Sequence, residues 1–263
     1  MVRLCAHLGY QFTEFDPLSR FEQASRAGFR AVEWPAIYAF SAQQLRDTID
    51  QCGLEWVQVT LPVGNAQNGE KGLAALPGRE SEFSDGLFRA IDYAMVLGAR
   101  WIHPMAGVVP SWDDPVVQNT YLNNIRLAIS AAEENGLGTL IEVIGEGEVP
   151  GYAMSSYTRA RRLFEEIGFD SLRLILDAYH AQILTGDASL VAAQWAGKIG
   201  HVQIADVPGR HEPGTGDIDF EVFFNVLEDM GYQGWVGCEY RPQNGTISGL
   251  KYLAKYMHKD CTL

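Results

Sequence analysis

The feature that most constrains the fold of this chain is a repeated alternation of short apolar runs with longer amphipathic segments. Eight apolar runs occur in the 263 residues, each rich in Val, Ile, Leu and Trp and without strict alternation of polar and apolar positions. Such runs are typical of parallel strands that are buried on both faces. The predicted strands span residues 3–8, 30–34, 55–60, 100–105, 139–144, 172–177, 198–204 and 235–240.

Residues that begin and end helices lie between these runs. Capping residues that start helices are expected at Asp16, Ser41, Asp114 and Asp219. Glycines just before the next run predict helix ends, because glycine adopts left-handed backbone angles without a steric penalty. These glycines are Gly28, Gly53, Gly98, Gly136, Gly168 and Gly231. The chain is therefore predicted to repeat one unit, a strand followed by a helix.

Eight such units in 263 residues favour a (β/α)₈ TIM barrel, an α/β fold of typically about 250 residues. A doubly wound sheet is the alternative, and its dinucleotide-binding form needs G-x-G-x-x-G after an early strand. The glycine pairs at 145–147 and 214–216 have neither that spacing nor that position. No linker or change in composition divides the chain, so a single TIM-barrel domain over 1–263 is predicted.

Composition narrows the classes of partner and location. Twenty Lys and Arg against 33 Asp and Glu give a net charge of −13, with no basic run. This charge disfavours nucleic acid and membrane surfaces as partners. The four cysteines form no CxxC pair, and no long apolar segment or secretory leader occurs. A cytoplasmic enzyme is expected, and a homo-oligomer of undetermined order is compatible with this barrel class.

Oxygen-bearing side chains lie at the ends of four consecutive predicted strands. They are Glu142, Asp177, Gln203 and Glu239. The carboxyl ends of barrel strands meet at the catalytic face, so these side chains are expected to converge. A single carboxylate there has an ordinary structural explanation, but several together would repel one another unless a cation joined them. The all-oxygen set predicts Mg²⁺ or Mn²⁺ rather than Zn²⁺.

Chemistry follows from the same set. Two glutamates beside a divalent metal suit removal and return of a proton at adjacent carbons, which is the work of an isomerase. His180 is a candidate to bind a substrate hydroxyl, and Arg210, in a loop rich in glycine and proline, is a candidate to bind a substrate carboxylate. The long loop 61–79 carries Lys71 and Arg79 and is expected to cover the substrate.

Five segments resemble the hydroxypyruvate isomerase family, within the xylose-isomerase-like barrels. They read GEKGLAALPGRE at 69–80, LDAYH at 176–180, IGHVQIAD at 199–206, HEPGTGDI at 211–218 and GYQGWVGCEY at 231–240. The resemblance implies a TIM barrel that interconverts hydroxypyruvate and 2-hydroxy-3-oxopropanoate, commonly with a divalent metal.

The resemblance also implies roles for particular residues. Glu142 and Glu239 match the acid/base pair, and together with Asp177 and Gln203 they match the metal ligands. His180, Glu148 and Arg210 match positions that contact substrate. Two segments depart from the family pattern: Glu142 is followed by Val-Ile-Gly where Pro-Ile-Asn is usual, and residues 103–110 resemble a sister group that isomerises 2-oxotetronates.

The predicted function is therefore an isomerase acting on hydroxypyruvate, through proton transfer by glutamates and a metal-stabilised enediolate. The alternatives are a 2-oxo-tetronate isomerase and a ketose 3-epimerase of the same superfamily. A metal-dependent endonuclease would need clustered histidines and a basic groove, whereas the ligand set here is oxygen-rich and the net charge is −13. A barrel that has lost catalysis is disfavoured because all four ligands are present. The expected partner is a small 2-oxo acid.

Overall fold

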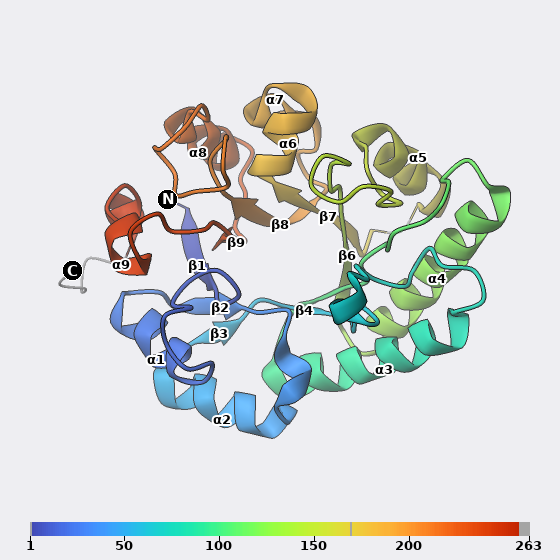
Figure 1. Cartoon of the computed structure of the whole chain (residues 1–263), viewed down its shortest axis with the longest axis horizontal. Coiled ribbons are helices and arrows are strands. Elements are labelled where there is room, and N and C mark those ends of the chain that lie inside the picture. The colour runs from blue at the N-terminus through green and yellow to red at the C-terminus, as the bar shows by residue number, and fades with distance from the viewer. Residues whose placement is uncertain (1, 169, 258–263) are drawn as a thin grey trace. The chain divides into compact units, whose positions relative to one another are not determined.

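The computed structural model describes residues 2–168 and 170–257 (Figure 1). The chain forms two compact units. The first comprises Met1–Val57 with Ile175–Leu263, and the second comprises Gln58–Leu174. Strand β7, Leu172–Asp177, contributes to both ranges. A single domain over residues 1–263 stays a prediction.

The sheet of the first unit carries most of the predicted site. Its strand order is β3-β2-β1-β9-β8-β7, and β1 pairs in parallel with both β2 and β9. Cys5 of β1 and Gln203 of β8 are both register partners of Gly237 in β9, so the three residues share one side of the sheet. Besides β7 the strands are β1 Arg3–His7, β2 Ala31–Glu33, β3 Glu55–Trp56, β8 Ile199–Ile204 and β9 Trp235–Cys238.

The second unit contains β4 Gln58–Thr60, β5 Trp101–His103 and β6 Gly138–Glu142, in the order β4-β5-β6. Parallel pairing joins β4 to β5 and β5 to β6. Every predicted apolar run therefore contains a strand. The run 55–60 is divided at Val57, because its first part pairs with β2 and its second part pairs with β5.

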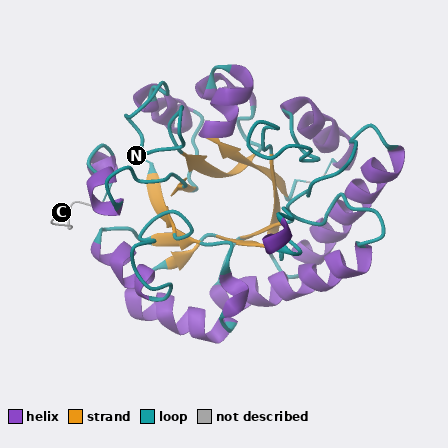
Figure 2. Ribbon diagram, viewed as in Figure 1, coloured by secondary structure: helices purple, strands orange, loops and turns teal. Residues whose placement is uncertain are grey.

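Helices lie outside the strands of each unit (Figure 2). They are α1 Ser19–Arg26, α2 Ala42–Cys52, α3 Glu80–Leu97, α4 Pro115–Glu134, α5 Tyr157–Ile167, α6 Ala178–Thr185, α7 Ala188–Gln194, α8 Phe220–Asp229 and α9 Thr246–Gly249, with single 3₁₀ turns at Ile37–Ala39, Ala66–Asn68 and Leu253–Tyr256. Their apolar faces make the core together with the strand residues. In α8, for example, Phe220, Phe223 and Phe224 are almost completely buried.

Three of the four predicted N-caps are confirmed. Side chains of Ser41, Asp114 and Asp219 accept hydrogen bonds from the first-turn amides of α2, α4 and α8. The prediction for Asp16 is wrong: α1 begins at Ser19, after a turn in which the Asp16 carbonyl accepts from the amides of Ser19 and Arg20. All six predicted glycines have positive φ, which confirms them as helix ends.

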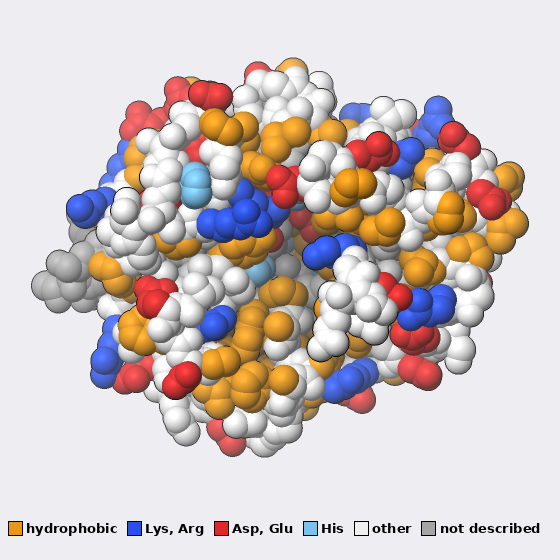
Figure 3. Space-filling view, viewed as in Figure 1, with side chains coloured by type: hydrophobic (Ala, Val, Ile, Leu, Met, Phe, Trp, Pro, Cys, Tyr) orange, Lys and Arg blue, Asp and Glu red, His pale blue; other side chains and the backbone are white. Residues whose placement is uncertain are grey.

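No helix within residues 2–168 and 170–257 is both long enough and apolar enough to cross a lipid bilayer. Acidic and basic side chains are interspersed over the face drawn in Figure 3. Cys5, Cys52 and Cys238 are free thiols, and Cys261 lies outside the described residues.

Candidate active site

Three of the predicted ligands lie at the carboxyl ends of strands in the first unit. Asp177 is the last residue of β7 and also caps α6, where its Oδ1 accepts from the Tyr179 amide at 2.8 Å. Gln203 is the penultimate residue of β8, and Glu239 directly follows β9. Asp177 and Gln203 are buried. The strands therefore place three oxygen-bearing side chains at their carboxyl ends. That these side chains bind a metal stays a prediction.

Arg210 joins two of these carboxylates. Its Nη2 donates to Asp177 Oδ2 at 3.0 Å and to Glu239 Oε1 at 2.9 Å. The guanidinium carbon also lies 5.4 Å from the ring centre of Tyr10 and 5.1 Å from that of Tyr179. The side chain is 9% exposed. A buried cation between the buried carboxylate of Asp177 and the partly exposed carboxyl group of Glu239 offsets their mutual repulsion. The sequence analysis gave this role to the metal alone.

The loop that carries Arg210 is organised by one buried carboxylate. Asp206 Oδ1 accepts from the amides of Val207 and Ile218, and its Oδ2 accepts from those of Gly214, Thr215 and Gly216, all at 2.9–3.1 Å. Arg210 has φ 57°, a left-handed conformation that is rare for a side chain of this size. The surrounding hydrogen bonds hold the arginine in this conformation beneath the loop.

Two histidines accompany the carboxylates. His180 Nε2 lies 3.6 Å from Asp177 Oδ2, and His7 Nε2 lies 4.0 Å from Glu239 Oε1. Burial lowers the pKa of His7, and the positive charge of Arg210 lowers it further. His7 is therefore neutral at physiological pH and is able to donate or accept a proton in a hydrogen bond.

The pKa of Glu239 is raised well above that of an ordinary carboxyl group. Burial raises its pKa to about 8, and the charges of Asp177 and Glu33 raise it too, whereas Arg210 lowers it. A carboxyl that titrates near neutral pH is suited to act as a general acid or base.

Gln203 is hydrogen-bonded to Glu33, a residue that the sequence analysis did not select. Its Nε2 donates to Glu33 Oε1 at 3.2 Å, while its own Oε1 is buried without a hydrogen-bond partner. An acceptor left in this state fits a cation ligand, because a bound cation would satisfy it. Together with the carboxylates of Asp177 and Glu239, the described residues of the first unit suit a hard divalent cation such as Mg²⁺ or Mn²⁺.

Glu142 occupies the corresponding place in the second unit. It is the last residue of β6, and its Oε2 lies 3.9 Å from Nε2 of His103, the last residue of β5. Burial raises the pKa of the Tyr152 hydroxyl, and the charge of Glu142 raises it further. Glu142 is thus a buried carboxylate at a strand end, and its convergence with the ligands of the first unit stays a prediction.

Three further candidates lie in loops of the second unit. Glu148 is exposed, and its amide donates to the Gly145 carbonyl at 3.0 Å. Lys71 is exposed as well. Arg79 lies 3.2 Å from Glu70 Oε1 and 2.6 Å from Glu82 Oε2, so its charge is shared between two glutamates. Their roles in binding substrate stay predictions.

Comparison with known proteins identifies the family. The family model described as a xylose isomerase-like TIM barrel matches residues 21–256. The chain belongs to this family. Within it, the chain is 39% identical to hydroxypyruvate isomerase of Escherichia coli, over 97% of this chain and 100% of the relative. It is 40% identical to 2-oxo-tetronate isomerase of Cupriavidus necator, over 98% of this chain and 99% of the relative.

A solved structure supports the same placement. A Brucella melitensis protein described as AP endonuclease, family 2, has a TM-score of 0.95 and 38% identity, over 98% of this chain and 100% of that chain. Membership of the xylose isomerase-like family confirms the predicted α/β TIM-barrel fold. The two named relatives confirm the predicted resemblance, and the chain is an isomerase of this family.

The residues missed by the sequence analysis have a common character. Glu33, His7 and Asp206 are buried polar residues at or next to strand ends in this xylose isomerase-like barrel. The signal for Glu33 was visible, since it is a carboxylate that closes the apolar run of β2 in the same way that Glu142 closes β6. Its partner could not be inferred, because Glu33 and Gln203 are 170 positions apart.

Proposed function

We propose that this isomerase interconverts hydroxypyruvate and 2-hydroxy-3-oxopropanoate. The observation that carries the proposal is the buried carboxyl of Glu239, with its pKa near 8, held by Arg210 beside Asp177. Such a group suits proton transfer at a carbon next to a carbonyl, and an arginine beside it suits an anionic substrate. The names of the full-length relatives support the same reaction class.

The proton transfers are assigned to Glu142 and Glu239. One glutamate takes the C3 proton of the bound 2-oxo acid, which gives an enediolate, and the other returns a proton to C2. The proton of the C3 hydroxyl moves to the C2 oxygen, so that C3 becomes the aldehyde and C2 carries the hydroxyl. Arg210 would bind the substrate carboxylate, and His180 would donate to a substrate hydroxyl. Glu148, Lys71 and Arg79 would contact the substrate from the loops.

A divalent metal fits the same residues. Asp177, Gln203, Glu239 and Glu142 would hold Mg²⁺ or Mn²⁺, which when bound supplies positive charge to the oxygens of the substrate. A cytoplasmic location and a homo-oligomeric state remain further predictions for this enzyme.

The segments that follow β5 and β6 favour a second candidate substrate. Residues 103–110 resemble the sister group that isomerises 2-oxotetronates, and the Val-Ile-Gly sequence after Glu142 departs from the usual Pro-Ile-Asn. The 2-oxo-tetronate isomerase relative is as similar to this chain as the hydroxypyruvate isomerase. A ketose 3-epimerase activity is the third alternative.

Proton NMR in D₂O tests the proposal directly. Purified protein is given hydroxypyruvate in one tube and a 2-oxotetronate in another. The reaction is run with Mg²⁺, or with Mn²⁺ that is removed after the incubation and before the spectra are recorded. Conversion of hydroxypyruvate with incorporation of deuterium supports the proposal, whereas conversion of the four-carbon acid alone replaces it by the second candidate. Silence with both acids, together with cleavage of duplex DNA at an abasic site, would overturn the isomerase assignment.

Variants test the two glutamates. Glu142→Gln and Glu239→Gln should each lower kcat by about 10²–10⁴-fold, the usual contribution of a general acid or base. Glu134→Gln, at the exposed end of α4, is the matched control and should retain wild-type kcat. Near-wild-type turnover by either of the first two variants would remove that glutamate from the mechanism.

A further inference from the structure

We propose that Glu33 is a positioning residue, which orients the side-chain amide of Gln203 so that its oxygen is presented to the metal. The inference rests on the proposed function in one respect, because it takes Gln203 as a ligand. Glu33 itself has no part in the proton transfers described above.

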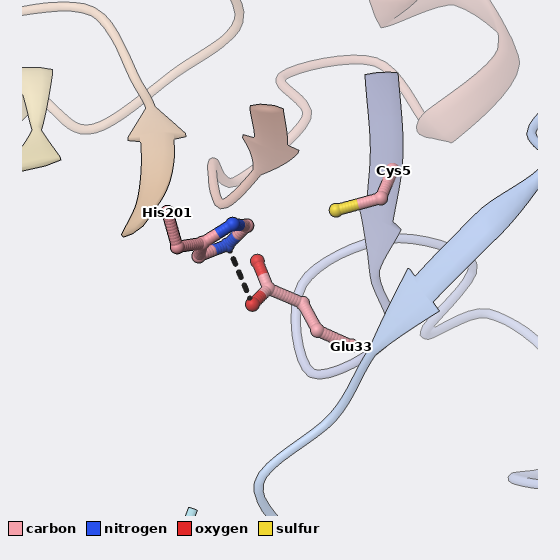
Figure 4. Close-up of side chains that lie close together, drawn as sticks. All are labelled: Cys5, Glu33 and His201. Atoms are coloured by element: carbon pink, nitrogen blue, oxygen red, sulfur yellow. Dashed lines mark ion pairs between the residues drawn. The ribbon is translucent and has the colours of Figure 1, made fainter. Parts of the chain in front are cut away.

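The contacts of Glu33 form a small network inside the first unit, and Figure 4 shows the one with His201. Its Oε1 accepts from Gln203 Nε2 at 3.2 Å, and its Oε2 lies 2.9 Å from His201 Nε2. All three side chains are at most 3% exposed. Each oxygen of the carboxylate therefore faces a nitrogen from β8, and the two nitrogens come from residues on the same side of that strand.

A carboxylate at this place fixes which end of the amide points where. An ionised carboxylate only accepts hydrogen bonds, so it can hold the NH₂ end of Gln203 and not the oxygen end. The oxygen end is the one left buried without a partner. An amide without Glu33 could turn over and present NH₂, which no cation binds. Glu33 thus decides whether Gln203 is a ligand or a donor.

Gly237 supplies an independent sign that the carboxylate belongs there. A Cβ at position 237 would collide with Glu33 Oε1 and lie 3.2 Å from Gln203 Cγ. The φ of Gly237 is not among the positive values, so the backbone itself does not require glycine. Glycine is instead required because the Glu33 carboxylate occupies the space, next to Gln203, that a side chain at position 237 would fill.

The same cluster includes a third ligand type, the thiol of Cys5. Single atoms of Cys5, Glu33 and His201 all lie within 4.8 Å of one another. A second cation here would need a thiolate, yet burial raises the pKa of Cys5 well above its ordinary value. Glu33 Oε1 moreover already accepts a hydrogen bond from Gln203, and its Oε2 lies 2.9 Å from His201 Nε2. The cluster is therefore assigned to holding Gln203.

Titration of metal-free protein with Mn²⁺, followed by electron paramagnetic resonance, measures the effect apart from turnover. Glu33→Gln should weaken Mn²⁺ binding by about 10–100-fold, as removal of a group that orients a ligand usually does. Gly237→Ala should weaken it in the same direction, by displacing the carboxylate without changing any charge. Cys5→Ala is the matched control from the same cluster and should leave the dissociation constant within about twofold.

A double variant separates orientation from mere structural support. Glu33→Gln combined with Gln203→Glu exchanges donor and acceptor, so the hydrogen bond is kept and a carboxylate oxygen is still presented. This double variant should recover most of the Mn²⁺ affinity lost in Glu33→Gln. Thermal unfolding and circular dichroism of each variant establish that it is folded.

The outcomes distinguish this inference from the proposed function. Wild-type Mn²⁺ affinity in both Glu33→Gln and Gly237→Ala, or no recovery in the double variant, would overturn the role of Glu33. If the wild type bound two equivalents of Mn²⁺ or Zn²⁺ and Cys5→Ala bound only one, the cluster would be a separate metal site. That result would overturn the role of Glu33. Binding that follows the expected order in a protein that isomerises neither acid would defeat the proposed function alone.

Discussion

Arg210 shows how a single residue changes the electrostatics of this site. Its guanidinium supplies one positive charge to Asp177 and Glu239, so the described residues of the first unit do not depend on a metal alone to relieve carboxylate repulsion. An arginine that already binds two carboxylates has donors directed at the place where an anionic substrate would compete. This cation therefore stabilises the fold in addition to its proposed role in binding the substrate.

Arg210→Met tests the structural half of that role. Removal of the cation leaves the buried Asp177 carboxylate and the neighbouring Glu239 carboxyl without a positively charged partner, so we expect the free energy of unfolding in EDTA to fall by about 3–5 kcal/mol. Urea denaturation measures the change, and Mn²⁺ should reduce the loss. Arg241→Met, an exposed neighbour, is the control. A loss below about 1 kcal/mol for Arg210→Met would place the pair among weak surface interactions instead.

The raised pKa of Glu239 has a consequence for stability against pH. Because its folded-state pKa of about 8 lies above its ordinary value of 4.5, folding favours the protonated carboxyl. The stabilisation is complete at low pH and is lost as the pH rises from about 4.5 through about 8.

Glu239→Gln removes that titration. In EDTA, we expect the free energy of unfolding of the variant, relative to that of the wild type, to increase as the pH is raised from 5 to 8.5. Denaturation at several pH values gives both curves. A difference between the two proteins that stays constant over this interval would show that Glu239 keeps an ordinary carboxyl pKa.

Among the elements, the loop from β8 to α8 depends most on one side chain. The amides around Asp206 need an acceptor with two oxygens, and asparagine would direct an NH₂ group at some of these donors. We expect Asp206→Asn to cost about 1–3 kcal/mol of stability and to raise KM for the 2-oxo acid, because Arg210 loses its support.

Hydrogen exchange over residues 206–218, read by mass spectrometry, measures the loosening. The amides of Gly214, Thr215 and Gly216 should exchange faster in Asp206→Asn. Asp217→Asn, an exposed residue of the same loop, should exchange as the wild type does. Unchanged exchange in both variants would mean that other contacts hold the loop.

The elements themselves were largely predictable, and the contacts between them were not. The strand β7 has the predicted bounds, and Ser41 caps α2 as expected, because strand burial and capping depend on neighbouring residues. The helix start at Asp16 failed since Pro17 continues a turn there. Asp177 and Glu239 were found from their places at strand ends, whereas the bridge from Arg210 depends on the course of a long loop.

At the scale of the whole molecule, charge and metal act together. A net charge of −13 leaves the chain with self-repulsion that a bound divalent cation partly offsets. Because a ligand that binds only the folded state stabilises it, Mn²⁺ at one hundred times its dissociation constant should add about 2.7 kcal/mol to the free energy of unfolding.

Urea denaturation with and without Mn²⁺ measures this gain, and Asp177→Asn should show a smaller one because it removes a predicted ligand. NaCl at the same ionic strength controls for screening by salt. Equal stabilisation of the wild type and Asp177→Asn by Mn²⁺ would place the cation somewhere other than the predicted ligands.

The grip of Asp206 on its loop also bears on redesign of the enzyme. All five donors are main-chain amides. The hydrogen bonds to Asp206 therefore depend on the conformation of the loop backbone and not on the identity of most of its side chains. Loop sequences of equal length that keep Asp206 and the glycines could be exchanged as cassettes. Variants of this loop would then alter the choice of substrate while the rest of the barrel stays unchanged.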